Sequence, residues 1–214
     1  MTKDAHSIVP LFAVPLYVNE GIKFSNKSLN YIKKLDYKVI SGSNGKISLD
    51  NYILNDSNLI DLKNIVETEI ENYVRQEMRI SDNINFYLCN SWVMKHTKGH
   101  RAPEHFHGNS IISGIMYLQC DDKSGDLTFS KPGTHTNFIH PCFVLDYDDW
   151  NINNSLSWTF RPRPGDIFLF PSFLYHRVAE SLSDNERYCI AFNIFIKGDL
   201  GIKEREKITA LYLK

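Results

Sequence analysis

Three histidines have the spacing that a metal site needs. His105 and His107 stand two residues apart, and His176 follows much later, after an apolar segment. In an extended segment successive side chains point to opposite faces, so His105 and His107 share one face. Two imidazoles on one face can bind one ion, and a third from a distant strand of a small barrel can complete the set. A centre of this kind with open coordination positions suits non-heme Fe(II).

Arg187 is the other residue whose position suggests chemistry. Small or polar residues alternate here with bulky apolar ones. One face carries Arg187, Cys189, Ala191 and Asn193, and the other carries Tyr188, Ile190, Phe192 and Ile194. The first face fits a cavity lining and the second fits packing against helices. A guanidinium at the back of a cavity would bind a carboxylate in bidentate geometry. The alternative is a surface ion pair with Asp184 or Glu186.

The segments around these residues have the two-residue period of β-strands. We expect core strands over residues 84–94, 111–119, 126–130, 157–161, 166–170 and 188–197, and an edge strand over residues 8–18 that Pro10 and Pro15 interrupt. Residues 95–103 are expected to form a polar loop. Several short strands after N-terminal helices predict a mainly β, α+β fold with an antiparallel barrel or sandwich.

Two helices are expected before the core strands, over residues 25–35 and 56–78. In the second, apolar residues recur at three- and four-residue steps, and Asp56 or Ser57 can cap its start. Its opposite face is charged, so the helix should lie against the outside of a sheet. We interpret residues 1–214 as one domain, with an N-terminal strand and buttressing helices in 1–83 and the core in 84–200. Residues 203–214 suggest a short helix or tail.

Composition excludes several classes of protein. The net charge of −1 and the pI of about 6.7 argue against nucleic acid or an anionic membrane as a partner. The four cysteines have no CxxC spacing and lie mostly in apolar runs, as buried thiols of a reducing compartment do. The first residues lack the apolar core of a signal peptide, and no apolar run approaches the roughly 18 residues of a membrane helix. We therefore expect a cytoplasmic protein.

Several short motifs occur in a characteristic order. They are Asn90-Ser91-Trp92, His105-x-His107-x-Asn109-Ser110, Ser113-Gly114-Ile115-Met116-Tyr117-Leu118, Gly125-Asp126-Leu127-Thr128-Phe129, Pro164-Gly165-Asp166, Phe170-Pro171-Ser172, His176-x-Val178 and Arg187. With this order and spacing the chain resembles the Fe(II)- and 2-oxoglutarate-dependent oxygenases, and within them a small bacterial and phage group of 2OG-Fe(II) oxygenases with a His-x-His motif. The resemblance covers about residues 84–196. It implies a double-stranded β-helix (jelly-roll, cupin-like) core.

The resemblance also implies roles for the site residues. His105, His107 and His176 would bind Fe(II), and Arg187 would bind the distal carboxylate of the co-substrate 2-oxoglutarate. The superfamily usually has a carboxylate two residues after the first histidine, where this chain has His107. The third ligand is therefore either a histidine or a carboxylate such as Glu104 or a loop aspartate.

A second departure from the superfamily lies near Arg187. The serine that usually stands two residues after the arginine is Cys189 here, a poorer hydrogen-bond donor. Tyr117 can contribute its hydroxyl instead, and Asn109 is a further candidate for the inner face. Asn90, Trp92 and Asn193 are candidates for the substrate side.

Four further histidines and one long irregular segment lie outside the proposed metal site. The histidines in polar loops are expected to be solvated; they are His96, His100, His135 and His140. The irregular segment between Phe129 and Ser157 is a candidate lid over the substrate.

The activity implied by the resemblance is hydroxylation of an unidentified small-molecule or peptide substrate, coupled to decarboxylation of 2-oxoglutarate. One alternative is a cupin-like three-histidine metalloenzyme that does not use 2-oxoglutarate. Another is a non-catalytic jelly-roll binding module. Dependence on both metal and 2-oxoglutarate, on metal alone, or on neither would discriminate among the three.

Overall fold

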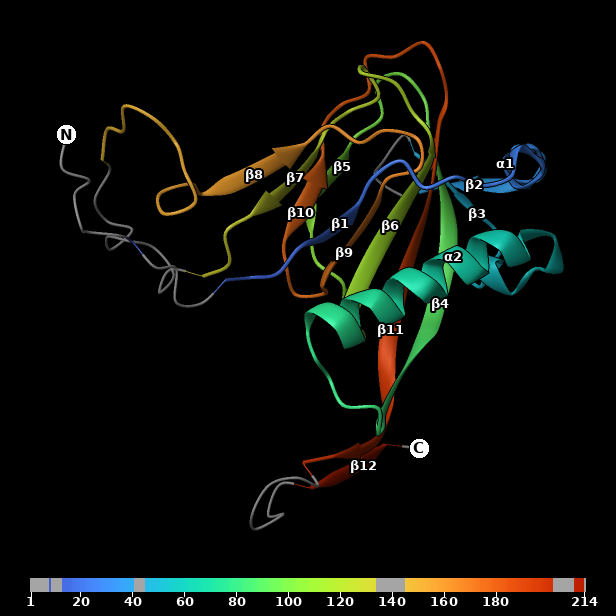
Figure 1. The fold of residues 1–214 in the computed structure, drawn as a ribbon. Helices are drawn as coiled ribbons and strands as arrows, with labels where there is room; N and C mark the ends of the chain where they lie inside the picture. The colour runs from blue at the N-terminus through green and yellow to red at the C-terminus, as the bar shows by residue number, and fades with distance from the viewer. Residues whose placement is uncertain (1–7, 9–12, 41–44, 134–144, 202–209, 214) are drawn as a thin grey trace.

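Two antiparallel β-sheets form the core of the protein, and one helix lies across the outer face of the larger sheet (Figure 1). The computed structural model describes residue 8 and residues 13–40, 45–133, 145–201 and 210–213. The mostly β architecture matches the predicted jelly-roll core.

The larger sheet holds eight strands. In spatial order they are β1 (Tyr17–Asn19), β9 (Ile167–Pro171), β6 (Ile112–Gln119), β11 (Arg187–Leu200), β4 (Ile84–His96), β3 (Lys46–Ser48) and β2 (Tyr37–Val39), with β12 (Leu211–Leu213) paired to the far end of β11. The smaller sheet has the order β5 (Ala102–His105), β10 (His176–Val178), β7 (Leu127–Ser130) and β8 (Ser157–Phe160). Pairing throughout is antiparallel between the named strands.

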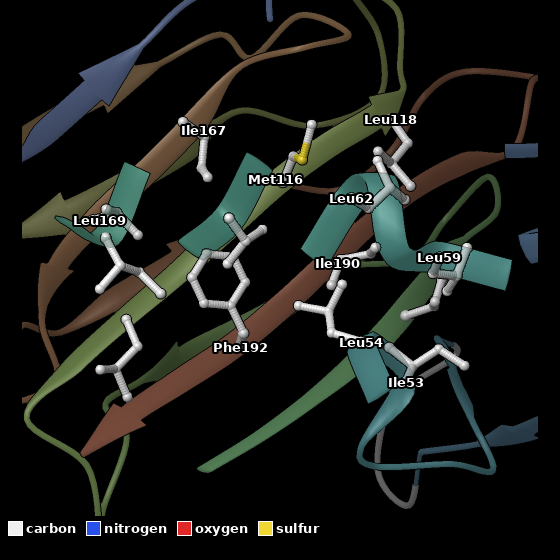
Figure 2. Packing of buried hydrophobic residues seen from close by; sticks show 14 of the residues in the cluster. Ile53, Leu54, Leu59, Leu62, Met116, Leu118, Ile167, Leu169, Ile190 and Phe192 are labelled. Atoms are coloured by element: carbon white, nitrogen blue, oxygen red, sulfur yellow. The ribbon is translucent and has the colours of Figure 1, made fainter. Parts of the chain in front are cut away.

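Strand β11 separates two apolar clusters, as the alternation of its side chains predicts. Its bulky face packs into the cluster beneath the helix, where Ile190 and Phe192 meet Met116 and Leu62 (Figure 2). Its small and polar face looks the other way, toward the smaller sheet, where Cys189 joins the second cluster. One strand therefore supplies both the helix-facing core and the lining of the interior.

Helix α2 (Ile60–Glu71) buries the apolar stripe that its sequence predicts. The stripe continues into a π-helical segment (Asn72–Glu77), and its buried residues are Leu59, Leu62, Val66, Ile70, Tyr73 and Val74. Asp56 caps the preceding 3₁₀ turn (Ser57–Leu59) by accepting a hydrogen bond from the Asn58 amide. The charged face carries an ion pair between Glu71 and Arg75. The shorter helix α1 (Asn26–Ile32) and a 3₁₀ turn (Ile53–Asn55) complete the helical layer.

The structure corrects several expected boundaries. The predicted loop over 95–103 is wrong at both ends, because β4 runs on to His96 and β5 begins at Ala102. Strand β4 is longer than its apolar run because it pairs with β11 along its whole length. Among the described residues of the N-terminal segment, the strand spans Tyr17–Asn19 and begins after the second proline. Of the expected helix or tail over 203–214, the described residues include a strand, β12, over Leu211–Leu213.

Three expectations fall partly or wholly outside the described residues. They concern the edge strand over 8–18, of which 9–12 are not described, the candidate lid, of which 134–144 are not described, and the helix or tail over 203–214, of which only 210–213 are described. His135, His140 and Cys142 belong to the same undescribed ranges. Within the described part of the chain, no helix has the length and apolar character needed to cross a bilayer.

Candidate active site

Strands β5 and β10 bring two of the predicted metal ligands together. The strands pair with His105 directly opposite His176, and the two ring centroids are 4.3 Å apart. His107 follows two residues after the end of β5, and its ring lies 5.1 Å from that of His176. One ligand atom from each of the three histidines lies within 4.8 Å of the others. The structure thus gathers the three side chains that the sequence spacing singles out.

Main-chain oxygens fix the orientation of two of these rings. His105 Nδ1 lies 2.8 Å from the carbonyl oxygen of Pro103, and His176 Nδ1 lies 3.0 Å from that of Leu174. A carbonyl oxygen only accepts, so Nδ1 carries the hydrogen and the lone pair of the neutral ring is on Nε2. An outer hydrogen bond of this kind is how proteins orient a histidine for a metal.

The third ring, that of His107, is oriented by side chains. Its Nδ1 lies 2.6 Å from Oδ1 of Asn193 in β11, and Ser113 of β6 donates to the same oxygen at 2.8 Å. Nδ2 of Asn193 donates to Oδ1 of Asn90 in β4 at 2.9 Å, which sets which way the amide points. Asn90 and Asn193 are therefore placed behind His107 and not in the pocket lining, contrary to the expectation of a substrate role.

Burial favours the neutral form of two of the three histidines, His107 and His176. It lowers the pKa of His176 to about 4, and it also lowers the pKa of His107. A metal binds the neutral imidazole, so at neutral pH no proton competes strongly for these two rings.

In the described part of the chain, no carboxylate joins the three histidines. Glu104 follows the alternation of β5 away from His105, hydrogen bonds to Ser130, and lies 3.5 Å from Arg177 Nη1. Of the alternatives left open by the sequence, the geometry favours three histidines over Glu104.

Arg187 is the most deeply buried charge near the site. Its side chain has no exposed surface, and Nη1 donates to the carbonyl oxygens of Ser124 and Gly125 at 3.2 and 3.1 Å. Gly125 has a φ of +91°, and a Cβ there would stand 2.3 Å from the Ala179 carbonyl oxygen, so this turn requires glycine. The alternative of a surface ion pair for Arg187 does not hold, because the side chain is buried and Glu186 pairs with Lys95 and Asp184 with Lys98.

The other edge of this guanidinium is largely unused. Nε has no hydrogen-bond partner within the described part of the chain, and Nη2 has only the weak contact to Cys189 Sγ at 3.9 Å. The guanidinium carbon lies 4.9 Å from the centre of the Tyr117 ring, and the buried Tyr117 hydroxyl also lacks a described partner. Unsatisfied donors at zero exposure are costly unless a ligand uses them. An oxyanion is the ligand that fits this edge.

Two histidines that sequence reasoning assigned to solvent are buried beside Arg187. His96 and His100 are each 1% exposed, with ring centroids 3.8 Å apart. His96 stands opposite Arg187 in the β4–β11 ladder. If the strand expected over 84–94 had been extended to residue 96, alternation would have placed His96 on the same face as Trp92. The polar residues around His96 argued for a loop instead and hid this pattern.

A single pocket connects the histidines to Arg187. Its empty volume is about 550 Å³. Its lining residues come from both sheets and the segments beside them; they are Trp92, Met94, His96, Ala102, His105, His107, Gly114, Ile115, Leu127, Phe170, His176, Val178, Arg187, Cys189 and Ala191. The pocket therefore has metal-ligating nitrogens in one part and a buried cation in another.

The remaining candidates divide by position. Trp92 lines the pocket, with its ring 5.9 Å from that of His107. Cys189 lines it beside Arg187. Asn109 does not: it is exposed in a turn, at a φ of +57°. The turn breaks the strand alternation, so counting positions from His107 fails there.

A family model agrees with the geometry of the site. The model described as "Putative 2OG-Fe(II) oxygenase" matches residues 90–193, which hold the three histidines, Arg187 and Asn193. No protein with a curated description matches the sequence.

Solved structures share the fold at low sequence identity. HygX from Streptomyces hygroscopicus, solved with nickel, 2-oxoglutarate and hygromycin B, is 13% identical with a TM-score of 0.57, covering 85% of this chain and 83% of its own. The 2-oxoglutarate-dependent epimerase SnoN of nogalamycin biosynthesis is 11% identical with a TM-score of 0.61, covering 85% and 76%. A Trichoplax adhaerens prolyl hydroxylase, solved with a hypoxia inducible factor peptide fragment, is 14% identical with a TM-score of 0.56, covering 84% and 83%.

The fold and the family match define the class of this protein. Residues 90–193 match the family of 2OG-Fe(II) oxygenases, and the fold is shared with solved 2-oxoglutarate-dependent enzymes, which supports the superfamily predicted from the sequence. The protein is accordingly a 2-oxoglutarate-dependent non-heme iron dioxygenase, with Fe(II) as metal and 2-oxoglutarate as co-substrate.

Proposed function

We propose that this protein hydroxylates a small molecule or a peptide, with iron bound by His105, His107 and His176 and with Arg187 holding the distal carboxylate of 2-oxoglutarate. The observation that carries the proposal is one pocket that holds three convergent imidazoles and a fully buried arginine with an unpaired edge. Bound Fe(II) and 2-oxoglutarate supply oxidation of a C–H bond by dioxygen as 2-oxoglutarate is decarboxylated to succinate.

The donor set fits a divalent transition metal. The two carbonyl-bonded rings present Nε2 lone pairs, and the third ring is held by Asn193. Three neutral nitrogens leave the metal with its full double charge, whereas a carboxylate ligand would reduce that charge by one. Together with the guanidinium of Arg187 the pocket would then hold three positive charges, and the dianion 2-oxoglutarate would neutralise two of them. The donor set thus favours binding of an anionic co-substrate beside the metal.

Arg187 fits a carboxylate at the other part of the pocket. Its Nε and Nη2 point from the same edge of the guanidinium, and this geometry matches the two oxygens of a carboxylate. The surrounding clusters are apolar, so water competes little for the pair. The residues of this chain then bind one end of the co-substrate and exclude solvent from it.

The substrate class is proposed from the pocket wall and from the relatives. Trp92 beside His107 offers an aromatic surface next to the metal ligands. Of the structural neighbours, one was solved with hygromycin B bound and another in complex with a peptide fragment. We therefore propose an organic molecule or peptide side chain as substrate, in a cytoplasmic enzyme with neither a membrane nor a nucleic acid as partner.

Separate titration of metal and 2-oxoglutarate tests the proposal. Purified protein under air is given Fe(II) and 2-oxoglutarate, together or singly, and succinate is measured. We expect succinate only when both are present, because slow uncoupled turnover needs no substrate. A metal-binding protein that forms no succinate and binds no 2-oxoglutarate would instead support the cupin-like three-histidine alternative, which the absence of a carboxylate among the described candidate ligands favours.

A further inference from the structure

We propose that His96 is a second anchor for the carboxylate that Arg187 binds, and so helps to select a five-carbon dicarboxylate as co-substrate. This inference rests on the proposed function. It concerns a residue whose polar neighbours in the sequence suggest a solvated loop.

The position of His96 puts it at the correct end of the pocket. It is paired with Arg187 across the β4–β11 ladder, and directly opposite residues of an antiparallel pair lie on the same face with Cβ atoms ~5 Å apart. Both side chains line the pocket. The His96 side chain therefore borders the space into which the free edge of Arg187 can reach.

The imidazole of His96 is buried without hydrogen bonds. At 1% exposure neither Nδ1 nor Nε2 has a partner anywhere in the described ranges, and Arg187 Nε and the Tyr117 hydroxyl are in the same state. His96 and Arg187 line the pocket and the Tyr117 ring lies against Arg187, and three neighbouring buried polar groups without partners are rare in native proteins. A carboxylate placed among them would accept a hydrogen bond from each, so one ligand accounts for all three.

His96 is held in a fixed place by residues outside the pocket. The ring of His100 meets it edge-on, at an interplanar angle of 71°. His100 in turn packs on the main chain at Gly45, where a Cβ would stand 2.1 Å from its ring. Because Gly45 has no Cβ, the main chain can pack directly against the His100 ring, which in turn contacts His96. His100 is therefore a positioning residue for His96.

The protonation state of His96 suits a donor that does not repel Arg187. Burial first, then the charge of Arg187 and the proximity of His100, lower the pKa of His96 well below its usual value. A neutral imidazole still carries one N–H, which can donate to a carboxylate oxygen. Cys189 is a weak donor beside the same guanidinium, so His96 supplies the neutral donor that the cysteine does not.

The test compares two 2-oxo acids that differ only in the distal carboxylate. Calorimetry on the full chain loaded with Ni(II) measures the affinity of 2-oxoglutarate and of 2-oxopentanoate for wild type, His96→Leu and His96→Gln. Loss of a hydrogen bond to a charged group predicts that His96→Leu binds 2-oxoglutarate ~10- to 100-fold more weakly. Binding of 2-oxopentanoate should be unchanged. His96→Gln retains a donor and should recover part of the loss.

The matched control is Lys98→Ala, an exposed substitution two residues further along the chain, which should bind both acids as wild type does. Equal affinity of His96→Leu and wild type for 2-oxoglutarate would overturn the inference. An equal loss for both acids would overturn it too, since that is the mark of a merely structural role. Failure of the wild type to prefer 2-oxoglutarate over 2-oxopentanoate would refute the proposed function itself, which separates the two failures.

Discussion

The two ends of the pocket are built in opposite ways. At the histidine end every Nδ1 is already satisfied by an oxygen of the protein, so that only lone pairs face inward. At the arginine end the donors Arg187 Nε and Tyr117 OH, together with both nitrogens of His96, lack partners within the described structure. The first end is complete except for a cation, and the second is complete except for an anion.

This contrast shows how a protein stores binding energy of two kinds. Satisfied outer hydrogen bonds orient the histidines before the metal arrives, so little entropy is lost on binding. Unsatisfied inner donors raise the free energy of the empty pocket, and an anion that pairs with them recovers that cost. The histidine end therefore binds its ligand through pre-oriented lone pairs, and the arginine end through unsatisfied hydrogen-bond donors. Substitutions at one end should change the affinity for that end's ligand and leave the other affinity unchanged.

The largest expected effect is loss of metal binding in His176→Ala. His176 is 6% exposed and lies opposite His105. Its ring packs against Phe129 and Phe170, so a water molecule that took its place as a metal ligand would lie against an apolar wall. Calorimetric titration with Ni(II) should show no binding. Arg177→Ala, the adjacent and exposed position, is the control and should bind as wild type does. Normal metal affinity in His176→Ala would break the assignment of the histidine end.

A smaller effect is expected for Arg187→Met, which keeps the volume but removes the charge. Breaking a buried charge pair costs about 3–5 kcal/mol, so 2-oxoglutarate should bind at least ~100-fold more weakly. Metal affinity should stay within about threefold of wild type, because Arg187 contacts none of the three ligand rings. The same calorimetry measures both. A variant that loses metal and co-substrate together would show that the two ends are not separable.

Asn193→Leu tests whether the outer hydrogen bonds do orient the metal ligands. It removes the acceptor of His107 Nδ1, and loss of such a contact typically lowers metal affinity ~10- to 100-fold. Asn193→Asp keeps an acceptor at the same place and should lose less. If both variants bound Ni(II) equally to wild type, the orientation of His107 would have to come from elsewhere.

The smallest effect concerns acid stability at the arginine end. Burial, together with Arg187, lowers the pKa of His100 to about 4, below the value of about 6.5 expected in the unfolded chain. Between these values the unfolded state binds more protons, so stability is complete above pH 6.5 and falls as the pH drops toward 4. The melting temperature should be lower at pH 4.5 than at pH 7, and His100 should account for about a few degrees of the difference.

His100→Asn supplies the comparison for this pH dependence. The variant should have a shallower fall in melting temperature than wild type, whatever its stability at pH 7. An identical pH dependence in the two proteins would mean that His100 does not stay neutral in the fold.

The sequence correctly predicted the positions of those residues that lie in or next to regular strands, where the spacing along the chain determines which face a side chain occupies. The two-residue step of His105 and His107 and the alternation after Arg187 survive in the structure because both segments lie in or directly after regular strands. The same alternation could have been used against Glu104, which was kept as a possible third ligand although it neighbours His105 and so faces away from it.

Other features depended on contacts that no local pattern reveals. His96 lies in a polar segment, and only pairing with β11 makes that segment a strand. The contact of Asn193 with His107 and Asn90 depends on the alignment of three segments, and the β4–β11 pairing shifts register directly after Asn193. Asn109 was expected on the inner face from the alternation after His107, but Asn109 itself has a left-handed backbone conformation, which ends that alternation.

Strand β11 carries both Arg187 at its start and Asn193 six positions later (193 − 187). An even separation leaves both side chains on the interior face, and at ~3.4 Å per residue it sets their spacing along the strand at ~20 Å. A single inserted or deleted residue between them would turn one of the two into the helix layer. The number of residues between Arg187 and Asn193 therefore matters independently of their identity: substitutions can weaken one end of the pocket alone, whereas an insertion or deletion between them would change which face one of the two side chains occupies.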